Sequence, residues 1–600
     1  MLGRFLAIFE RGERWRLAGL LGLTLAGGVL ETVGVGVVLP YLALVSDSSL
    51  TERYTWLANL HSQLGSPSHG ALLVIVSLAL IVFFLFKNGY MVWLQDRQVR
   101  FANTKQVDLS RRLLASYFLR PYQQQLAGSS SVMARDLTYS VTEVCNGLIF
   151  ASLGLATDVF AAAGILATLL FVEPTATLVG GVTLITFGWL LYRFLRGRIA
   201  LYSRRQHREL GDMLRQAGEA AGALKEVRIL GVEGFFLDRF RDSALRNTRD
   251  LRLFQFVNSL PKASAEMLLT FLLAGAVVLL VIGRQDIAAA LPLLGVFAAA
   301  AVRLMPMVSR VSTRLNTARK AMPSLEVVID ALETLKSAAT AGIVLPARAE
   351  ISFEKQIRMD RVAFRYRSQN RSLFDGFSLD IRCGERVALI GRTGSGKSTL
   401  LDLLLGLLEP EAGSVLVDGV NIRDNLRSWR NLIGYIPQHI YLLDDSVRRN
   451  VALGIPDEQI DEQRVWQVLE MAEMAAVVRA LPDGLQARVG ERGGLLSGGQ
   501  RQRIGIARAL YHEPRILLMD EATSALDNET ESRVLRTIDR LTHERTLIMI
   551  AHRLSSVQQC ERVILMDTGR IVDEGTFAEI AQRHPDFVNP DRSRADPSRV

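Results

Sequence analysis

The side chains best suited to chemistry lie in one stretch, VALIGRTGSGKSTLLDLLLG, where an apolar strand is followed by a glycine-rich turn and a helix. Glycines let consecutive backbone N–H groups face phosphate oxygens at the positive end of that helix. Lys397 is placed to reach the β and γ phosphates, and Ser398 to supply an oxygen to Mg²⁺. The pattern predicts a site for ATP and Mg²⁺, built from Gly391, Gly394, Ser395, Gly396, Lys397, Ser398 and Thr399.

Two further apolar strands end in side chains that suit the same chemistry. RILLMDEATSALD carries Asp520 and Glu521 at the end of its strand, and TLIMIAH ends in His552. Ligands bind where the carboxyl ends of parallel strands meet, so we expect these residues beside the glycine-rich turn. Asp520 is suited to hold Mg²⁺ through water, Glu521 to polarise an attacking water, and His552 to contact the γ phosphate. The three predict ATP hydrolysis.

A second helix begins with small residues, in LLSGGQRQRIGIARAL. Ser497, Gly498, Gly499 and Gln500 form another anion-binding helix start, this one without a lysine. A single domain has little use for two such starts around one nucleotide. We therefore expect this one to bind the ATP of another copy of the chain.

Residues from about 351 to 585 resemble the nucleotide-binding domain of ABC transporters. LSGGQ is similar to that family's signature, YIPQ to its Q-loop, SALD to its D-loop and FRYRS to its adenine-stacking segment. The resemblance implies that Tyr366 stacks on adenine, that Gln438 joins Ser398 and Asp520 around Mg²⁺, that Asp527 is the D-loop aspartate and that His552 is the switch histidine. In that family two domains sandwich two ATP molecules. The resemblance thus implies a homodimer with two competent sites.

The rest of the chain has a different composition. Residues 1–330 carry apolar runs long enough to cross a bilayer, and the net charge of +9 comes from basic residues beside those runs. That placement predicts membrane topology and argues against a nucleic-acid partner. The three widely spaced cysteines predict neither a disulfide framework nor a zinc site. A nucleic-acid ATPase of the same family is a weaker alternative, because such a protein needs no spans.

We expect six spans, at about Leu17–Val45, Ala71–Gln95, Ser140–Val172, Thr175–Leu195, Ala263–Ile282 and Ile287–Val308. Polar helical extensions rich in Arg and Lys follow the second and fourth, so these extensions and the N-terminus should be cytoplasmic. Two tips, Leu119–Leu126 and Leu224–Phe236, are candidates for touching the ATPase domain. The outer connection from Leu50 to Leu64 has an amphipathic pattern, typical either of a helix on the membrane surface or of one packed on its own protein.

These features resemble an exporter half-transporter. The implied fold class is a membrane all-α domain of six helices, with the type IV ABC exporter fold, followed by an α/β P-loop ATPase domain. We expect a transmembrane domain at 1–330, a linker at 331–350, the ATPase domain at 351–588 and a disordered tail at 589–600. The expected location is the bacterial inner membrane, with the ATPase domain in the cytoplasm.

Charged residues inside the spans indicate what is moved. Lys87, Lys262 and Arg303 lie about 24–30 Å from the outer ends of their spans, at about 1.5 Å of rise per residue. Intramembrane ions usually mark a substrate path, so the three cations could line a chamber for a phosphate-bearing substrate. The structural alternatives are snorkelling, a Lys262–Glu266 pair, or neutralisation by Glu31 and Asp158.

A narrower resemblance links ETVGVGVVLPYLALVSD, FKNGYMVW, LPKASAE and VRLMPMVSR to the lipid-linked oligosaccharide flippases of bacterial N-glycosylation. It implies ATP-driven flipping of a polyprenyl-pyrophosphate glycan from the cytoplasmic to the outer leaflet, with membrane lipid and this glycan as partners. The alternative is an exporter of another amphipathic substrate: a lipid, a lipopolysaccharide precursor, a peptide or a drug.

Overall fold

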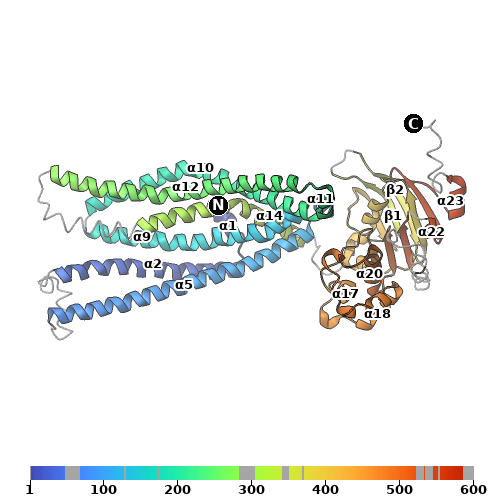
Figure 1. Cartoon of the computed structure of the whole chain (residues 1–600), viewed down its shortest axis with the longest axis horizontal. Coiled ribbons are helices and arrows are strands. Elements are labelled where there is room, and N and C mark those ends of the chain that lie inside the picture. Colours follow the sequence, from blue (N-terminus) through green and yellow to red (C-terminus); the bar gives the residue numbers. More distant parts are fainter. Residues whose placement is uncertain are drawn as a thin grey trace. The chain divides into compact units, whose positions relative to one another are not determined.

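The computed structural model describes residues 2–46, 68–126, 130–172, 174–282, 305–340, 350–367, 371–521, 533, 545–551 and 554–585. The chain divides into two compact units. The first comprises Met1–Arg120 and Ala127–Ile343, and the second comprises Pro121–Leu126 and Val344–Val600. Figure 1 shows a helical unit and a unit built around strands.

The first unit is all helical where it is described. Its labelled α-helices are α1 (Leu2–Leu6), α2 (Arg11–Ser46), α5 (His69–Leu119), α7 (Ser130–Arg135), α8 (Val141–Val144), α9 (Ala151–Val172), α10 (Pro174–Gly222), α11 (Leu224–Leu230), α12 (Glu233–Ile282) and α14 (Met322–Thr340). Two π-helical turns, η1 (Asp136–Ser140) and η2 (Cys145–Phe150), flank α8. Residues 305–320 are also helical.

The predicted spans fall inside these long helices. Three helical segments of the described chain are long and apolar enough to cross a membrane: Arg11–Gly34, His69–Leu119 and Ser130–Thr168. The fourth and fifth predicted spans lie within α10 and α12, whose remaining residues form the polar extensions. As expected, α5 continues without interruption from its apolar half into its basic half. Most of the sixth predicted span lies outside the described residues.

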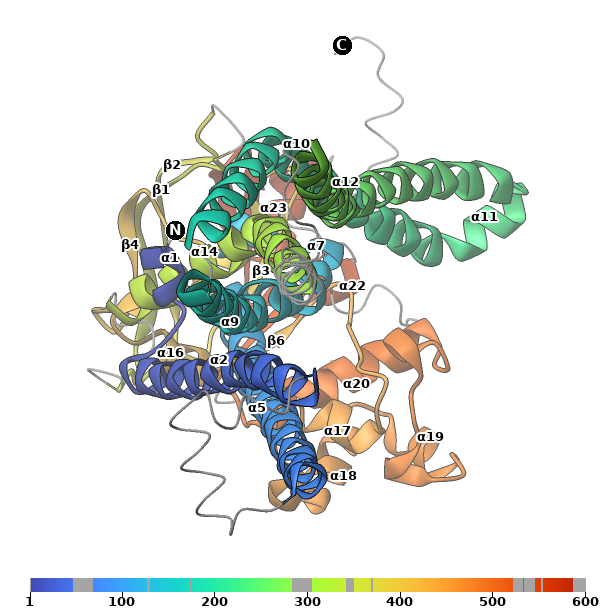
Figure 2. The same ribbon diagram turned by 90° about the vertical axis from the view of Figure 1, so that its left-hand side faces the viewer.

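Small residues set the spacing of the helices within this unit. A Cβ on Gly28 of α2 would lie 3.0 Å from the Cβ of Phe160 on α9, and Thr32 fills the space beside Gly164 one turn further on. The two helices therefore run parallel in fixed register. Helices α10 and α12 pack against each other through Leu195, Ile199, Phe254 and Val257. Figure 2 shows this pair side by side, with α11 at the end where they join.

Residues 331–340 of the expected linker are helical. Helix α14 runs to Thr340, because Val328 and Ala331 are buried in a cluster with the N-terminal Ile8 and Phe9. Apolar residues at helical spacing thus continue the first unit past residue 330.

The second unit contains two sheets. Its strands are β1 (Gln356–Phe364), β2 (Phe374–Arg382), β3 (Arg386–Gly391), β4 (Ala412–Val417), β5 (Val420–Asn421), β6 (Ile433–Ile436), β7 (Ile516–Asp520), β8 (Thr546–Ile550), β9 (Arg562–Asp567) and β10 (Arg570–Gly575). One sheet has the order β2-β1-β4-β5 and is antiparallel, and the other has the order β10-β9-β3-β8-β7-β6. In the second sheet the strands from β9 to β6 are parallel.

The described α-helices of this unit are α6 (Tyr122–Leu126), α15 (Lys397–Leu404), α16 (Leu426–Asn431), α17 (Val447–Val451), α18 (Glu462–Met471), α19 (Ala475–Arg479), α20 (Gly498–Tyr511), α22 (Leu554–Val557) and α23 (Phe577–Arg583). Helices α15, α16, α20 and α23 contact strands of the parallel sheet. Alternate residues of β7 belong to different cores: Leu517 and Met519 to one, Ile516 and Leu518 to the other. This pattern is typical of a parallel strand buried on both sides.

Several predictions concern residues outside the described part of the chain. They are Arg303, Asp527 and His552, the outer connection from Leu50 to Leu64, and the tail at 589–600.

Candidate functional site

The glycine-rich turn joins β3 to α15 in a conformation that its glycines permit. Gly391, Gly394 and Gly396 have φ angles of 146°, 83° and 102°, a region that L side chains rarely adopt. A Cβ on Gly391 would also overlap the carbonyl oxygen of Met566. The loop therefore places its backbone N–H groups ahead of a helix N-terminus, as binding of a phosphate requires.

Lys397 lies buried in this loop and binds the loop's own carbonyl oxygens. Its Nζ donates to Gly391 O at 2.8 Å and to Arg392 O at 3.0 Å. Burial lowers the pKa of Lys397, and the carboxylates of Glu521 and Asp520 oppose that shift. The N–H groups of this ammonium can donate to phosphate oxygens in place of the two carbonyl oxygens. The ammonium also lies close enough to the two carboxylates to interact with their charges.

The two acids lie at the expected edge of the sheet. Asp520 ends β7 and pairs in register with Ile550 of β8, which in turn pairs with Leu389 of β3. Glu521 follows with a φ of 48°, and its backbone N–H donates to Ile550 O at 3.1 Å. The Nε2 of Gln438, two residues after β6, donates to Glu521 Oε2 at 2.6 Å. The structure thus brings Lys397, Asp520, Glu521 and Gln438 together.

A third carboxylate lies nearby, and the sequence analysis missed it. Burial, and secondarily the charge of Asp520, raises the pKa of Asp402 on α15 to about 6. Tyr122 of α6 is near it, since burial and then Asp402 raise the pKa of that tyrosine. Tyr122 packs on the same apolar cluster as Tyr366. The expected tip at Leu119–Leu126 therefore does contribute α6 to the ATPase unit.

The expected adenine-stacking residue also touches the loop. The hydroxyls of Tyr366 and Thr399 lie 3.0 Å apart, and the Tyr366 ring packs edge-on to Phe364, with 5.1 Å between ring centroids. The hydroxyl of Ser398 lies on an exposed residue at the first turn of α15. These oxygens and the Asp520 carboxylate are hard ligands of the kind that Mg²⁺ takes beside substrate phosphates, so the residues present fit Mg²⁺-ATP.

The second helix start is built by reciprocal capping. Ser497 Oγ accepts from Gln500 N at 3.2 Å, and Gln500 Oε1 accepts from Ser497 N at 2.8 Å. This capping box fixes the start of α20, a helix of 14 residues, and leaves the N–H groups of Gly498 and Gly499 at its positive end.

Ion pairs hold several charged side chains in the described part of the membrane unit. Lys87 is 5% exposed, and its Nζ donates to Glu31 Oε2 at 2.8 Å. Neutralisation by Glu31, one of the structural alternatives, therefore describes Lys87. The chamber of three cations stays a prediction, because Arg303 lies outside the described residues. Lys262 is exposed, and among the described residues it has no ion pair with Glu266 or any other carboxylate.

A second ion cluster joins α9 to the helix at 305–320. Asp158 is 4% exposed; its Oδ1 lies 2.8 Å from Arg310 Nε and its Oδ2 3.1 Å from Arg314 Nε. The sequence predicted that Asp158 neutralises a cation. Its two partners were missed because they follow Val308, the expected end of the last span.

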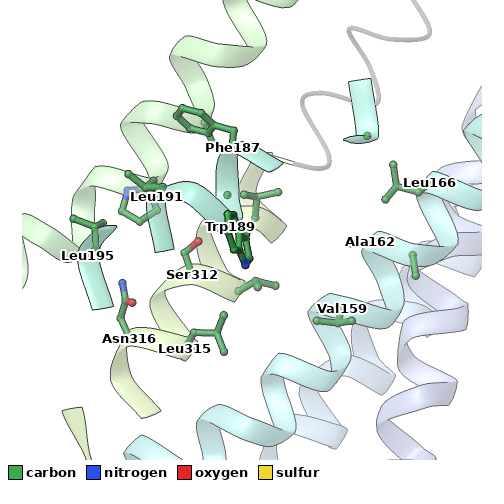
Figure 3. Close-up of a pocket in the computed structure, with 17 residues that line it drawn as sticks. Val159, Ala162, Leu166, Phe187, Trp189, Leu191, Leu195, Ser312, Leu315 and Asn316 are labelled. Atoms are coloured by element: carbon green, nitrogen blue, oxygen red, sulfur yellow. The ribbon is translucent and has the colours of Figure 1, made fainter. Parts of the chain in front are cut away.

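An apolar pocket of about 490 Å³ lies between α9, α10, α12 and the helix at 305–320. Figure 3 shows Trp189, Leu191, Val159 and Leu315 around it, with Ser312 and Asn316 as polar residues on one wall. Its lining suits hydrocarbon.

A helical membrane unit followed by an α/β unit with a P-loop, a paired Asp-Glu strand end and an LSGGQ helix start defines the class of ATP-driven exporters. Residues 374–524 match the family described as "ABC transporter". The chain is 30% identical over 498 residues to an ATP-dependent lipid A-core flippase of Cupriavidus pinatubonensis, covering 82% of each chain. It is 33% identical over 470 residues to one of Ralstonia nicotianae, covering 77% of each.

A solved structure agrees in fold. The structure described as a bacterial Atm1-family ABC exporter with ATP bound superposes with a TM-score of 0.78, over 98% of this chain and 99% of that one, at 24% identity. The chain therefore belongs to the ABC transporter family, as an ATPase-driven membrane exporter with both units fused in one polypeptide.

Proposed function

We propose that two copies of this chain form a homodimer in a bacterial inner membrane, and that the homodimer uses ATP to move a phosphate-bearing amphipathic lipid from the cytoplasmic to the outer leaflet. The observation that carries the proposal is the likeness to lipid A-core flippases, which extends over 82% of the chain and so includes the membrane unit.

In the ATPase site, Lys397 and the loop N–H groups would hold the β and γ phosphates, while Ser398, Asp520 and Gln438 would hold Mg²⁺. Bound Mg²⁺ would neutralise charge on the phosphates. Glu521 orients the attacking water and accepts its proton. The N–H groups at Gly498 and Gly499 stabilise the ATP of the partner subunit. Roles for Asp527 and His552 follow from the family pattern.

The cargo is a glycolipid with a phosphorylated head group. The relatives are named for lipid A-core, so a lipopolysaccharide precursor is favoured over a polyprenyl-pyrophosphate glycan. The Lys87–Glu31 pair leaves one unpaired cation fewer for the phosphate of either lipid. Lys262 remains available to an anion, and the apolar pocket suits the hydrocarbon part of such a lipid.

A screen of ATPase stimulation tests this proposal. The full chain is reconstituted in phosphatidylcholine nanodiscs, and turnover is measured with diphosphoryl lipid A, a polyprenyl-pyrophosphate glycan, or an uncharged lipid of similar size. We expect diphosphoryl lipid A to stimulate most. Stimulation only by the polyprenyl lipid would reassign the cargo, and stimulation only by uncharged compounds would contradict a phosphate-bearing substrate.

A further inference from the structure

The cluster of Asp158, Arg310 and Arg314 has one cation more than its carboxylate can neutralise. Both guanidinium groups lie within 3.1 Å of the same carboxylate, through their Nε atoms. The group carries a net positive charge inside the membrane unit. A purely structural ion pair there needs only one arginine, so the second leaves a positive charge that an anion can neutralise.

The two arginines are held differently. Arg314 is fixed, because its guanidinium occupies the space that a Cβ on Gly154 would fill, and its Nη1 is buried without a hydrogen-bond partner. The side chain of Arg310 is 48% exposed, and within the described part of the chain its two Nη atoms donate to no acceptor. Both Nη atoms of the planar Arg310 guanidinium are thus free to donate, and a planar guanidinium with two such donor atoms can bind a phosphate through two hydrogen bonds.

The cluster also lies at a suitable level of the bundle. The fixed register of α2 and α9 places Asp158 about five residues, or about 8 Å, to the cytoplasmic side of Glu31. The opposite side of the Arg310 helix lines the apolar pocket, through Val308, Val311 and Leu315. One helix therefore presents cations on one face and a hydrocarbon-lined pocket on the other.

We propose that Arg310 is the residue that binds a phosphate group of the transported lipid, and that Asp158 holds Arg310 until the lipid arrives. The phosphate replaces Asp158 at Arg310, while Arg314 stays on Asp158 and keeps its charge neutralised. The phosphate can be a monoester on a disaccharide lipid or the pyrophosphate of a polyprenyl lipid. This inference rests on the proposed function and assigns the head-group contact within it.

The test measures how much lipid gives half-maximal ATPase stimulation in phosphatidylcholine nanodiscs. Three preparations are titrated: diphosphoryl lipid A, the same lipid with its phosphates removed, and a polyprenyl-pyrophosphate glycan. We expect Arg310→Gln to raise the half-maximal amount about tenfold for the phosphate-bearing lipid that stimulates the wild type. The half-maximal amount of the dephosphorylated lipid should stay the same. Which of the two responds identifies the source of the phosphate.

Two further variants separate binding from folding. Asp158→Asn removes the competing anion, so it should lower the half-maximal amount, a direction that a structural defect would not give. Arg310→Lys keeps the ion pair but loses the fork, so it should give an intermediate value even if the other variants misfold. Arg198→Gln, which removes an exposed arginine of α10, is the matched control and should behave as wild type.

The outcomes distinguish the two claims. Two results would overturn the role of Arg310 and leave the proposed function standing. One is a half-maximal amount of lipid equal to the wild-type value for both Arg310→Gln and Arg310→Lys. The other is an equal shift of that amount with the dephosphorylated lipid. No stimulation of the wild type by either phosphate-bearing lipid would overturn the proposed function and this inference with it.

Discussion

At the residue scale, a hydrogen bond between Gln438 and Glu521 positions the carboxylate that we expect to activate water. The 2.6 Å hydrogen bond between them fixes the carboxylate beside Lys397 and Asp520, whose charges act on the same buried loop. A carboxylate held in this way is placed to accept a proton from the attacking water. Its charge, rather than its shape, is what the reaction needs.

Glu521→Gln tests this role, because glutamine keeps the size of the side chain and loses its basicity. We expect ATP hydrolysis to fall at least about a hundredfold, the usual contribution of a general base, while ATP binding persists. Turnover and binding of a fluorescent ATP analogue are measured on the same preparation. Turnover near that of the wild type would assign the base elsewhere.

Asp402 gives a pH-dependent prediction. Burial raises its pKa from the usual 3.8 to about 6, so the folded state holds the proton more tightly than the unfolded state does. Its ionised form therefore destabilises the fold as pH rises above 3.8, with the full cost above about 6. Asp402→Asn should raise the free energy of unfolding of the nucleotide-free protein by about 1–2 kcal/mol at pH 8, a figure reduced for the partial exposure of the carboxyl group, and by about half as much at pH 5.

Denaturant unfolding of the ATPase unit within the full chain measures this difference. Asp483→Asn, at an exposed carboxylate, is the control and should change stability little at either pH. An equal effect of Asp402→Asn at both pH values would mean that Asp402 titrates normally.

At the element scale, α6 is notable because it belongs to the ATPase unit although its neighbours in the chain, α5 and α7, belong to the membrane unit. Its Tyr122 packs with Tyr366 on the apolar core beside the P-loop helix. We therefore expect this short helix of five residues to influence the nucleotide site.

Tyr122→Ser should loosen this packing and lower the ratio of lipid-stimulated to basal ATPase activity severalfold. Gln124→Ser, on the exposed side of the same helix, serves as the control. An unchanged ratio for Tyr122→Ser would show that α6 does not transmit the response.

Elements with strong local patterns could be predicted from the sequence, whereas for ion pairs between distant residues the sequence offered only alternatives. The glycine-rich turn predicted the P-loop, and the apolar runs predicted the long helices, because each of these signals is one continuous stretch of sequence. The partner of Lys87 lies 56 residues away in the sequence, and that of Arg310 lies 152 residues away. The π-helical turns η1 and η2 depend on packing, which no local pattern specified.

At the scale of the whole molecule, one chain carries one P-loop and one signature, so two composite sites require two chains. Lys397→Ala disables the P-loop, and Ser497→Arg disables the signature. In a homodimer of either variant, both composite sites contain one disabled part. In a mixed dimer, one site contains the disabled P-loop and the disabled signature, and the other site contains two intact parts. A mixture of the two variants should therefore bind photoreactive ATP at a composite site better than either variant alone. No gain on mixing would contradict the sandwich arrangement.

The central claim is that ATP drives a phosphate-bearing lipid across the bilayer. The most direct measurement is the transfer of fluorescent diphosphoryl lipid A across the membrane of proteoliposomes whose ATPase units face outward, followed by quenching of the label that remains outside. The account predicts that Mg²⁺-ATP moves label to the inner leaflet with the wild-type chain and not with Glu521→Gln. Equal protection of the label with both chains, or with the wild type in the absence of ATP, would contradict it.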